Sequence, residues 1–212
     1  MAASWSGVSG VRGEGMKKIV IATKNQGKLR EMQDAFSVLP VEVVSLETFG
    51  RLPDAVEDGA SFAENARIKA AFYRELTGCA CIADDSGLEV EALGGAPGIY
   101  SARFSGSHAD DDMNNAKLLS ELSRAGAEES PADYRCALAF LDTNGKEILT
   151  EGRCDGIVRK VAKGSNGFGY DPYFYRGERT IAEMSFEEKD KISHRGEALR
   201  KMAEELRQYL KG

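Results

Sequence analysis

The sequence predicts an α/β protein. Short runs typical of β-strands alternate along the chain with longer stretches whose apolar residues recur at helical spacing. With 42% hydrophobic and 29% charged residues among 212 positions, the chain can bury a real core, as one domain or as two lobes that share a cleft. An Asn-Gly pair between two β-like runs predicts a hairpin, so part of the sheet is expected to be antiparallel.

The first fifteen residues differ from the rest. Residues 1–15 are rich in Gly and Ser and lack the apolar centre of a secretory signal. We interpret residues 1–15 as a disordered extension and residues 16–212 as a single folded domain. No apolar run approaches the roughly 18 to 20 residues that span a bilayer, so no membrane partner is expected.

The elements of the first half follow from apolar spacing. In the first helix, Leu29, Met32, Phe36 and Leu39 share one face. Ser61 with Glu64 has the pattern of a capping box at the start of the second helix. The expected elements are strands at 17–22, 41–46 and 79–83, and helices at 27–39 and 61–76.

The second half contains the hairpin. Strands are expected at 134–142 and 146–153, joined through Asn144-Gly145, which readily adopts positive φ. Helices are expected at 109–124 and 193–210. The acidic run at 110–112 suits the positive end of the first of these helices and is interpreted as a solvated cap.

Composition excludes some classes of function. Cys79, Cys81, Cys136 and Cys154 lack the paired spacing of a zinc site, and we interpret them as buried small apolar residues. A disulfide framework is not expected in a chain of this size without a signal, so a reducing cytoplasm fits. The net charge of −6 argues against a broad nucleic-acid-binding face.

The most informative segment is residues 82–87, where an apolar run meets two adjacent carboxylates, Asp84 and Asp85. Charges are disfavoured at the end of a buried strand unless a cation compensates them, so the pair is a candidate metal site. The alternative is a solvated turn in which an Asp caps the next element.

Three further segments contain candidate binding residues. The loop at 23–28 opens a helix and offers backbone N–H groups to a phosphate, but it lacks the Gly spacing of a Walker A loop, so taken alone an ordinary surface turn is the favoured interpretation. The glycine-rich loop at 164–171 offers Phe168 and Tyr170 for stacking and Asp171 for a ring N–H, or it is an ordinary flexible loop. At 193–195, Ser193 is a plausible N-cap that presents His194 and Arg195.

Together these segments closely resemble the inosine triphosphate pyrophosphatase family, also called the Ham1-like family. The resemblance spans residues 17–210 and rests on six ordered motifs: ATKNQGKLRE at 22–31, EDGASFAENA at 57–66, IADDSGL at 82–88, LGGAPGIYSARFSG at 93–106, GFGYDP at 167–172 and ISHRG at 192–196. It implies a two-lobed fold with a long mixed sheet, a central nucleotide cleft, a homodimer and a magnesium requirement.

The resemblance also implies roles for individual residues. Asp85 would accept a proton, with Lys28 and Lys69 as further catalytic residues, and Glu57 with Asp85 would hold Mg²⁺. The substrate, a purine nucleoside triphosphate such as ITP, dITP or XTP, would contact the following residues: Thr23, Lys24, Asn25, Gln26, Gly27, Lys28, Ser86, Phe168, Gly169, Tyr170, Asp171, Lys189, His194 and Arg195. The sequence departs from the family at Asn166, where a Gly is more usual, which leaves the loop backbone at that position in question.

Other functions remain open at this point. A Maf-like pyrophosphatase would share a similar fold but act on dTTP, UTP or modified pyrimidine nucleotides. A catalytically silent protein would bind the same ligand without releasing pyrophosphate. A structural protein would not need these polar segments together.

Overall fold

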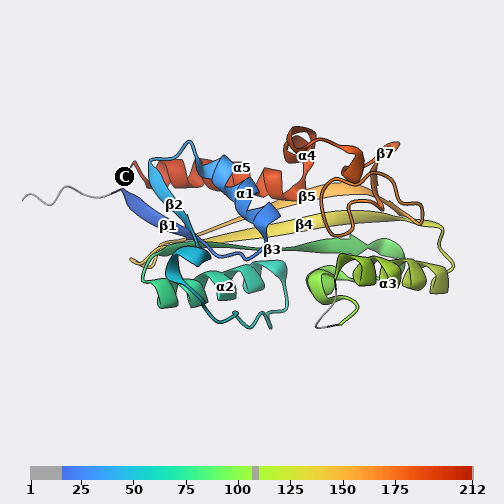
Figure 1. Ribbon diagram of the computed structural model, residues 1–212, viewed down its shortest axis with the longest axis horizontal. Coiled ribbons are helices and arrows are strands. Elements are labelled where there is room, and N and C mark those ends of the chain that lie inside the picture. Colours follow the sequence, from blue (N-terminus) through green and yellow to red (C-terminus); the bar gives the residue numbers. More distant parts are fainter. Residues whose placement is uncertain (1–15, 107–109, 212) are drawn as a thin grey trace, which may run out of the picture.

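The computed structural model describes residues 16–106 and 110–211, so the predicted extension at 1–15 lies outside the described residues. One sheet of seven strands runs along the molecule in the order β2-β1-β3-β4-β5-β6-β7 (Figure 1). The strands are β1 (Lys17–Ile21), β2 (Val41–Ser45), β3 (Ala80–Val90), β4 (Glu129–Leu141), β5 (Glu147–Arg159), β6 (Phe174–Arg176) and β7 (Arg179–Thr180). Because β2, β1 and β3 are parallel and the other pairs antiparallel, the sheet is mixed, as expected.

Helices cover both faces of this sheet. The α-helices are α1 (Gln26–Phe36), α2 (Phe62–Thr77), α3 (Asp111–Arg124), α4 (Phe186–Ile192) and α5 (His194–Tyr209), and the 3₁₀ turns are η1 (Leu46–Phe49), η2 (Glu91–Leu93), η3 (Gly98–Arg103) and η4 (Ile181–Glu183). Helices α1 and α5 lie on one face, and α2 and α3 lie on the other (Figure 1). The fold class predicted from the sequence is confirmed.

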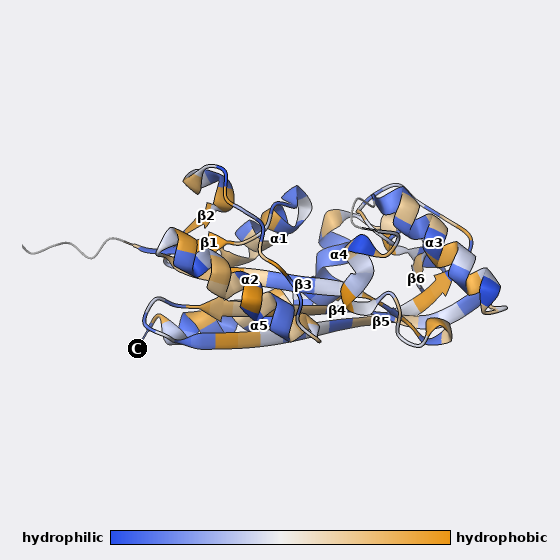
Figure 2. Cartoon of the chain, turned by 90° about the horizontal axis from the view of Figure 1, so that it is seen from below, coloured by the Kyte–Doolittle hydropathy of each residue, from blue (hydrophilic) through white to orange (hydrophobic). Residues whose placement is uncertain are grey.

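The core follows the alternation of side chains along the strands. Ile19 and Ile21 of β1 pack beneath α1 and α5, whereas Val20 faces α2 on the other side. A third apolar cluster fills the opposite end of the molecule around β4, β5 and α3. The helices carry hydrophilic and hydrophobic residues on different sides (Figure 2), as amphipathic helices on a sheet require.

Strands β3, β4 and β5 are longer than the apolar pattern predicts. The expected strand at 79–83 continues through both aspartates to Val90. It stays extended because β4 pairs with it without interruption, from Cys81 opposite Leu141 to Val90 opposite Ala132. Strands β6 and β7 and helix α4 were not predicted, because segments of two to seven residues carry too little periodicity. Since β3, β4 and β5 extend through both ends of the molecule, we propose residues 16–212 as one two-lobed domain.

Both predicted N-caps are present. Ser61 accepts from the backbone N–H of Glu64, and Ser193 accepts from that of Gly196. The capping box is wrong in one detail, since the carboxylate of Glu64 accepts from Ala60 N and not from the cap residue itself.

The four cysteines are free thiols. The interpretation as buried apolar residues is confirmed for Cys81, Cys136 and Cys154, whereas Cys79 is only half-buried. Burial raises the pKa of Cys81 and of Cys136 to about 12. Within the described residues, no helix combines the length and the apolar character needed to cross a bilayer.

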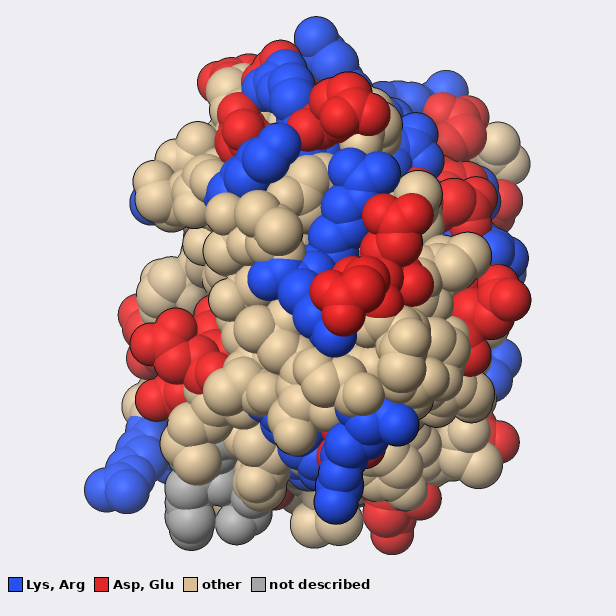
Figure 3. Space-filling view, turned by 90° about the vertical axis from the view of Figure 1, so that its right-hand side faces the viewer, with Lys and Arg blue, Asp and Glu red and all other residues tan. Residues whose placement is uncertain are grey.

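The surface at the end of the molecule near β6 and β7 mixes charges of both signs (Figure 3). Arg159 pairs with Glu129 at 2.8 Å, and Arg179 pairs with Glu188 at 3.0 Å. On this face, basic side chains therefore lie beside acidic ones instead of forming one positive patch.

Candidate active site

The site begins where β1 ends. Strand β1 pairs with β3 only as far as Ile21 opposite Ile82, and the last backbone contact is Ala22 N to Ile82 O at 2.8 Å. Beyond this point one edge of β3 has no neighbouring strand from β1. On this edge the backbone carbonyl of Asp84 accepts instead from a side chain, Lys69 Nζ, at 2.9 Å. In sheets with parallel strands, ligands bind at the carboxyl ends of the strands, where such an opening forms.

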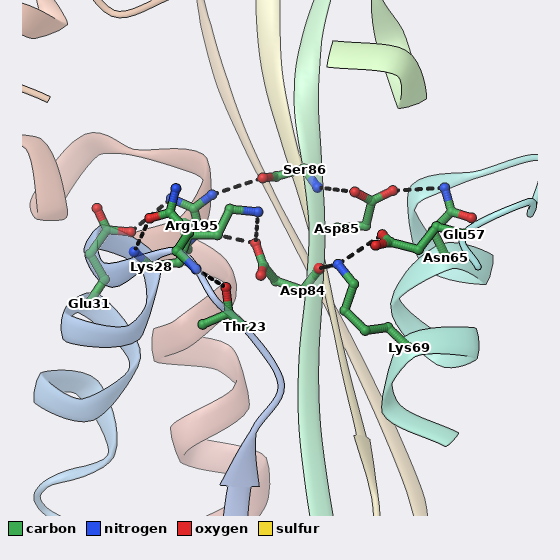
Figure 4. A network of polar contacts seen from close by, with 11 residues as sticks. Thr23, Lys28, Glu31, Glu57, Asn65, Lys69, Asp84, Asp85, Ser86 and Arg195 are labelled. Carbon is green, nitrogen blue, oxygen red and sulfur yellow. Dashed lines mark hydrogen bonds and ion pairs between the residues drawn. The ribbon is translucent and has the colours of Figure 1, made fainter. Parts of the chain in front are cut away.

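The two adjacent aspartates face opposite sides of the sheet. Successive side chains of a strand alternate between its faces, and Asp84 and Asp85 both lie within β3. Figure 4 shows Asp84 directed toward Lys28 and Arg195, and Asp85 directed toward Asn65. The interpretation of the pair as a solvated turn is therefore wrong, and Asp84 cannot share a metal site with Asp85.

Asp84 is the centre of a buried group of charges. Its side chain accepts from Lys28 Nζ at 2.9 Å and from Arg195 Nε at 3.4 Å. Burial alone would raise the pKa of Asp84, but Lys28, Arg195 and Lys69 together hold it well below its usual range. Arg195 also donates to Glu31 Oε2 at 2.8 Å and to Ser86 Oγ at 2.8 Å. Two carboxylates and two cations thus neutralise one another inside the protein.

Asp85 lies in a different environment on the other face. Its carboxylate accepts from Asn65 Nδ2 at 3.0 Å and from the backbone N–H of Ser86 at 3.0 Å. Burial raises the pKa of Asp85, and Glu57 raises it further, although Asn65 and Lys69 partly offset this. A carboxylate with a raised pKa is a stronger base than a free one.

Glu57 and Lys69 complete this second group. Lys69 Nζ pairs with Glu57 Oε2 at 2.8 Å. Burial would lower the pKa of Lys69, but Asp84 and Glu57 raise it above its usual value. With two carboxylates and one ammonium, the group formed by Glu57, Lys69 and Asp85 carries one net negative charge (Figure 4).

The donors of this second group suit a magnesium ion. Mg²⁺ prefers oxygen ligands and is commonly bound by one or two carboxylates together with water and substrate phosphates. Glu57 and Asp85 are two such carboxylates, and a cation would compensate the burial that raises the pKa of Asp85 as well as the smaller repulsion from Glu57. The described residues contain no cluster of three or more His, Cys, Asp or Glu, so the protein would supply only part of the coordination shell.

The loop before α1 holds part of the predicted phosphate site. Asn25 caps the helix by accepting from Lys28 N at 3.0 Å, and Thr23 Oγ1 accepts from Asn25 N at 3.2 Å. The first N–H groups of α1 and the Lys28 ammonium therefore lie beside the carboxyl end of β1. Gly27 lies against the ring of Phe168, where an added Cβ would come within 3.3 Å of it.

Two of the residues predicted to bind the substrate point elsewhere. The exposed Lys24 ammonium pairs with Asp54, and the Gln26 amide donates to Glu47 Oε1 at 3.2 Å. Neither side chain reaches the group around Asp84. The sequence could not separate them from Asn25 and Lys28, because all four lie within one turn of chain.

A cavity of about 140 Å³ lies between α1, β3, α3 and α5. Most of the residues predicted to contact the substrate line it: Asn25, Lys28, Ser86, Phe168, Gly169, Tyr170, Asp171, Lys189, His194 and Arg195. Asp85, Glu57 and Lys69 lie on the other side of β3 and do not line it. Lys189, His194 and Arg195 are buried.

The glycine-rich loop forms one wall of the cavity. Asp171 Oδ2 accepts from Lys189 Nζ at 2.7 Å and from Phe168 N at 3.0 Å, and Tyr134 donates to Oδ1 at 3.3 Å. Because both of its carboxylate oxygens already accept hydrogen bonds from the protein, Asp171 orients Lys189 and does not serve as the predicted acceptor for a ring N–H of the base. Gly167 has φ +82°, and a Cβ there would lie 2.1 Å from Asp171, so this position requires glycine.

The aromatic residues of the loop have different roles. The Phe168 ring is half-buried, with the Lys189 ammonium 4.4 Å from its centre. Tyr170 is buried in the core and donates to Ser101 O at 2.7 Å, so Phe168 offers the better stacking face. Asn166 does not adopt positive φ and instead donates to Met184 O at 3.1 Å, which removes the question raised by the missing glycine.

His194 is neutral in this environment. Burial lowers its pKa well below the usual value, and the charges of Arg195 and Lys189 lower it further. Its ring stacks on Tyr134 with the centres 4.7 Å apart. Its Nδ1 atom is buried and has no hydrogen-bond partner among the described residues.

Comparison with known proteins identifies the family of this chain. The model of the Ham1 family matches residues 19–205. The chain belongs to the Ham1 family. A relative from Desulfotalea psychrophila named dITP/XTP pyrophosphatase is 48% identical over 195 residues, which cover 91% of this chain and 86% of the relative. One of the same name from Geobacter sulfurreducens is 46% identical and is covered to 97%.

Solved Ham1-family structures have the same fold. A HAM1 protein from Coxiella burnetii is 38% identical with a TM-score of 0.84, over 91% of this chain and all of that one. A nucleoside-triphosphatase / dITP/XTP pyrophosphatase from Mycobacterium abscessus is 44% identical with a TM-score of 0.71, over 87% and 98%.

Sequence reasoning missed several residues of this Ham1-family site. Glu31 follows Lys28 by one helical turn, and this spacing was the only local signal that it faces the same group. Asn65, Tyr134 and Asn115 gave no such signal, because their partners are remote in the sequence. The interpretation of the acidic run at 110–112 as a cap holds for Asp110, which accepts from Met113 N at 2.8 Å, but is wrong for Asp111, which accepts from Gly169 N at 2.7 Å.

Proposed function

We propose that this protein hydrolyses the non-canonical purine nucleoside triphosphates ITP, dITP and XTP to the monophosphate and pyrophosphate in a Mg²⁺-dependent reaction. Membership of the Ham1 family supports hydrolysis of a triphosphate anhydride, because close relatives carry the name dITP/XTP pyrophosphatase. The observation that carries the proposal is the open edge of β3. At this edge, a base-sized cavity with cationic donors lies on one face of the sheet, and the carboxylates of Glu57 and Asp85 lie on the other face.

The open edge of β3 suggests how one ligand reaches both the cavity and the carboxylates of Glu57 and Asp85. The base would occupy the cavity, with its face on Phe168. The triphosphate would pass Lys28 and the first N–H groups of α1 and reach Asp85 across the edge at Ser86. Arg195 Nη2 already donates to Ser86 Oγ at 2.8 Å, so this part of the path is preorganised.

Asp85 would act as the general base. Water would attack the α-phosphorus, its proton would pass to the Asp85 carboxylate, and the bond from the α-phosphorus to the bridging oxygen would break. Pyrophosphate would leave with its charge balanced by Lys28 and Lys69. Mg²⁺ held by Glu57 and Asp85 would supply Lewis-acid stabilisation of the phosphate oxygens.

Base selectivity would come from fixed donors. Lys189 and Arg195 present N–H groups near the cavity, and a 6-oxo group can accept from them. The 6-amino group of adenine cannot accept and would leave buried donors unpaired, which disfavours ATP. Three of the five N–H groups of Arg195 are already bonded, so Arg195 is held in one orientation.

The test is a substrate panel. Purified protein with Mg²⁺ is incubated with ITP, dITP, XTP, ATP, GTP, dTTP and UTP, and monophosphate, pyrophosphate and orthophosphate are measured. We expect turnover of the first three with pyrophosphate as product. A preference for pyrimidines would assign the protein to the Maf-like activity, orthophosphate would contradict the bond cleaved, and binding without turnover would indicate a silent nucleotide-binding protein.

Magnesium is tested separately by binding. Titration of Mn²⁺ followed by electron paramagnetic resonance should show binding to the wild type and a loss of it in Glu57→Gln. The exposed Glu47 provides a matched control, because Glu47→Gln removes the same charge near α1 without touching Asp85. Equal binding by all three proteins would remove Glu57 from the metal site.

We also propose a homodimer in the cytoplasm. A groove of about 420 Å³ between α2, β4, β5 and α5 supports an interface, and light scattering tests the mass in solution. The four free thiols support a reducing compartment, which cell fractionation tests.

A further inference from the structure

The first turns of α3 hold two separate segments of the chain, both of which contribute residues to the cavity. One of them is η3, which contributes Ser101 and Ala102, together with the residues that follow it. Asn114 Oδ1 accepts from Ser105 N at 2.9 Å, and its Nδ2 donates to Ala102 O at 3.3 Å. Because Asn114 is buried, this contact fixes the loop to the helix. None of the catalytic assignments above uses α3.

The other loop is the glycine-rich wall. Asp111 Oδ2 accepts from Gly169 N at 2.7 Å, and Asn115 Nδ2 donates to Gly169 O at 2.9 Å. Asp111 and Asn115 are four positions apart and therefore share one face of α3. Both backbone polar groups of Gly169 are thus bonded to the same helix.

Gly169 is the point at which this contact acts on the base site. It lies between Phe168, which faces the cavity, and Tyr170, which is buried. Its φ of +64° places it in a turn outside regular structure, so no strand or helix ladder fixes its peptides. Movement at Gly169 would displace the Phe168 ring and, through Phe168 N, the carboxylate of Asp171.

We propose that Asp111 and Asn115 are positioning residues that set base selectivity by clamping Gly169. The inference rests on the proposed function, since it takes the cavity as the base site. A 6-oxo and a 6-amino base differ by the exchange of an acceptor for a donor. A fixed pocket rejects the wrong base because polar groups stay unpaired, whereas a loosened loop lets those groups move and pair again.

The test uses a matched pair of variants on one helix turn. Asp111→Ala removes the acceptor for Gly169 N, and Asp112→Ala removes the same charge from the same helix end without a contact to the loop. The ratio of kcat/KM for ITP to that for ATP is measured, together with the ratio of their Kd values by calorimetry without Mg²⁺. Asp111→Asn, which keeps an acceptor oxygen, serves as the conservative rescue.

We expect Asp111→Ala and Asn115→Ala each to reduce both ratios by about tenfold, the loss of roughly one hydrogen bond. The value of kcat for ITP should stay within about threefold, because Asp85 and Lys28 are not displaced. Asp112→Ala and Asp111→Asn should resemble the wild type.

Two results would overturn the clamp. Unchanged ratios in Asp111→Ala and Asn115→Ala would do so, and so would an equal loss for both nucleotides accompanied by a lower unfolding midpoint, which indicates a structural role alone. If the wild type binds ITP but does not hydrolyse it, the proposed function fails, while the Kd ratios still decide the role of Asp111 and Asn115.

Discussion

Replacing each of the two adjacent aspartates by Asn should have opposite consequences for stability and function. Asp84 pairs with Lys28 and Arg195 in the interior, whereas Asp85 is a carboxylate whose pKa is raised. We therefore expect Asp84→Asn to destabilise the fold strongly. We expect Asp85→Asn to leave stability nearly unchanged while lowering turnover of ITP by orders of magnitude.

The magnitudes follow from the contacts. Removing one partner of a buried ion pair costs about 3–5 kcal/mol, and the lower end applies at Asp84 because Arg195 keeps its contact with Glu31. At about 2–4 °C per kcal/mol for a chain of this size, Asp84→Asn should lower Tm by roughly 6–12 °C. Asp85→Asn loses one hydrogen bond, worth about 1 kcal/mol, but also removes an unfavourable buried charge, so its Tm should change by less than about 4 °C.

The assay is thermal unfolding by circular dichroism at pH 7.5 in EDTA, and ITP turnover is measured separately with Mg²⁺ and without EDTA. EDTA matters because a bound cation would stabilise ionised Asp85 and hide the difference. Equal Tm losses in the two variants would refute the assignment of Asp84 and Asp85 to opposite environments. Near-normal turnover by Asp85→Asn would remove Asp85 from the chemistry.

Three further predictions concern single residues. Since the pKa of His194 is lowered in the folded protein, protonation of His194 favours the unfolded chain. The free energy of unfolding should therefore fall as pH drops below about 6.5, by at most about 1.4 kcal/mol per pH unit. Urea titrations at several pH values should show a shallower fall in His194→Gln. Glu31→Gln should reduce kcat/KM for ITP by about tenfold, because Arg195 loses a partner that orients it. Lys28→Met should reduce ITP turnover by about 100-fold or more, whereas Lys24→Met should stay within about fivefold, because the Lys24 side chain forms an exposed ion pair elsewhere.

Each of these has a contradicting result. An identical pH slope in His194→Gln between pH 6.5 and 5 would show that His194 does not titrate on unfolding. Unchanged kinetics in Glu31→Gln would mean that Arg195 needs no orientation by α1. Equal losses in the two lysine variants would mean that Lys24 leaves Asp54 and joins the substrate.

Local pattern determined much of the fold. The α/β class, the Asn144-Gly145 hairpin and the caps Ser61 and Ser193 depend on interactions within a few residues, which the sequence displays directly. The ordered motifs also indicated the family, and most of the residues carried over from it line one cavity. Such features were predictable because neighbouring positions along the chain decide them.

Tertiary structure alone decided how the charges are paired. The register of β3 against β4 extends the strand through Asp84 and Asp85 and places them on opposite faces, which the apolar run did not indicate. Arg195 meets Glu31 across 164 positions, and no local pattern records that pairing. A side chain's protonation and orientation depend on burial and on partners brought together by packing, so the sequence named the candidate residues while the assembled sheet assigned their environments.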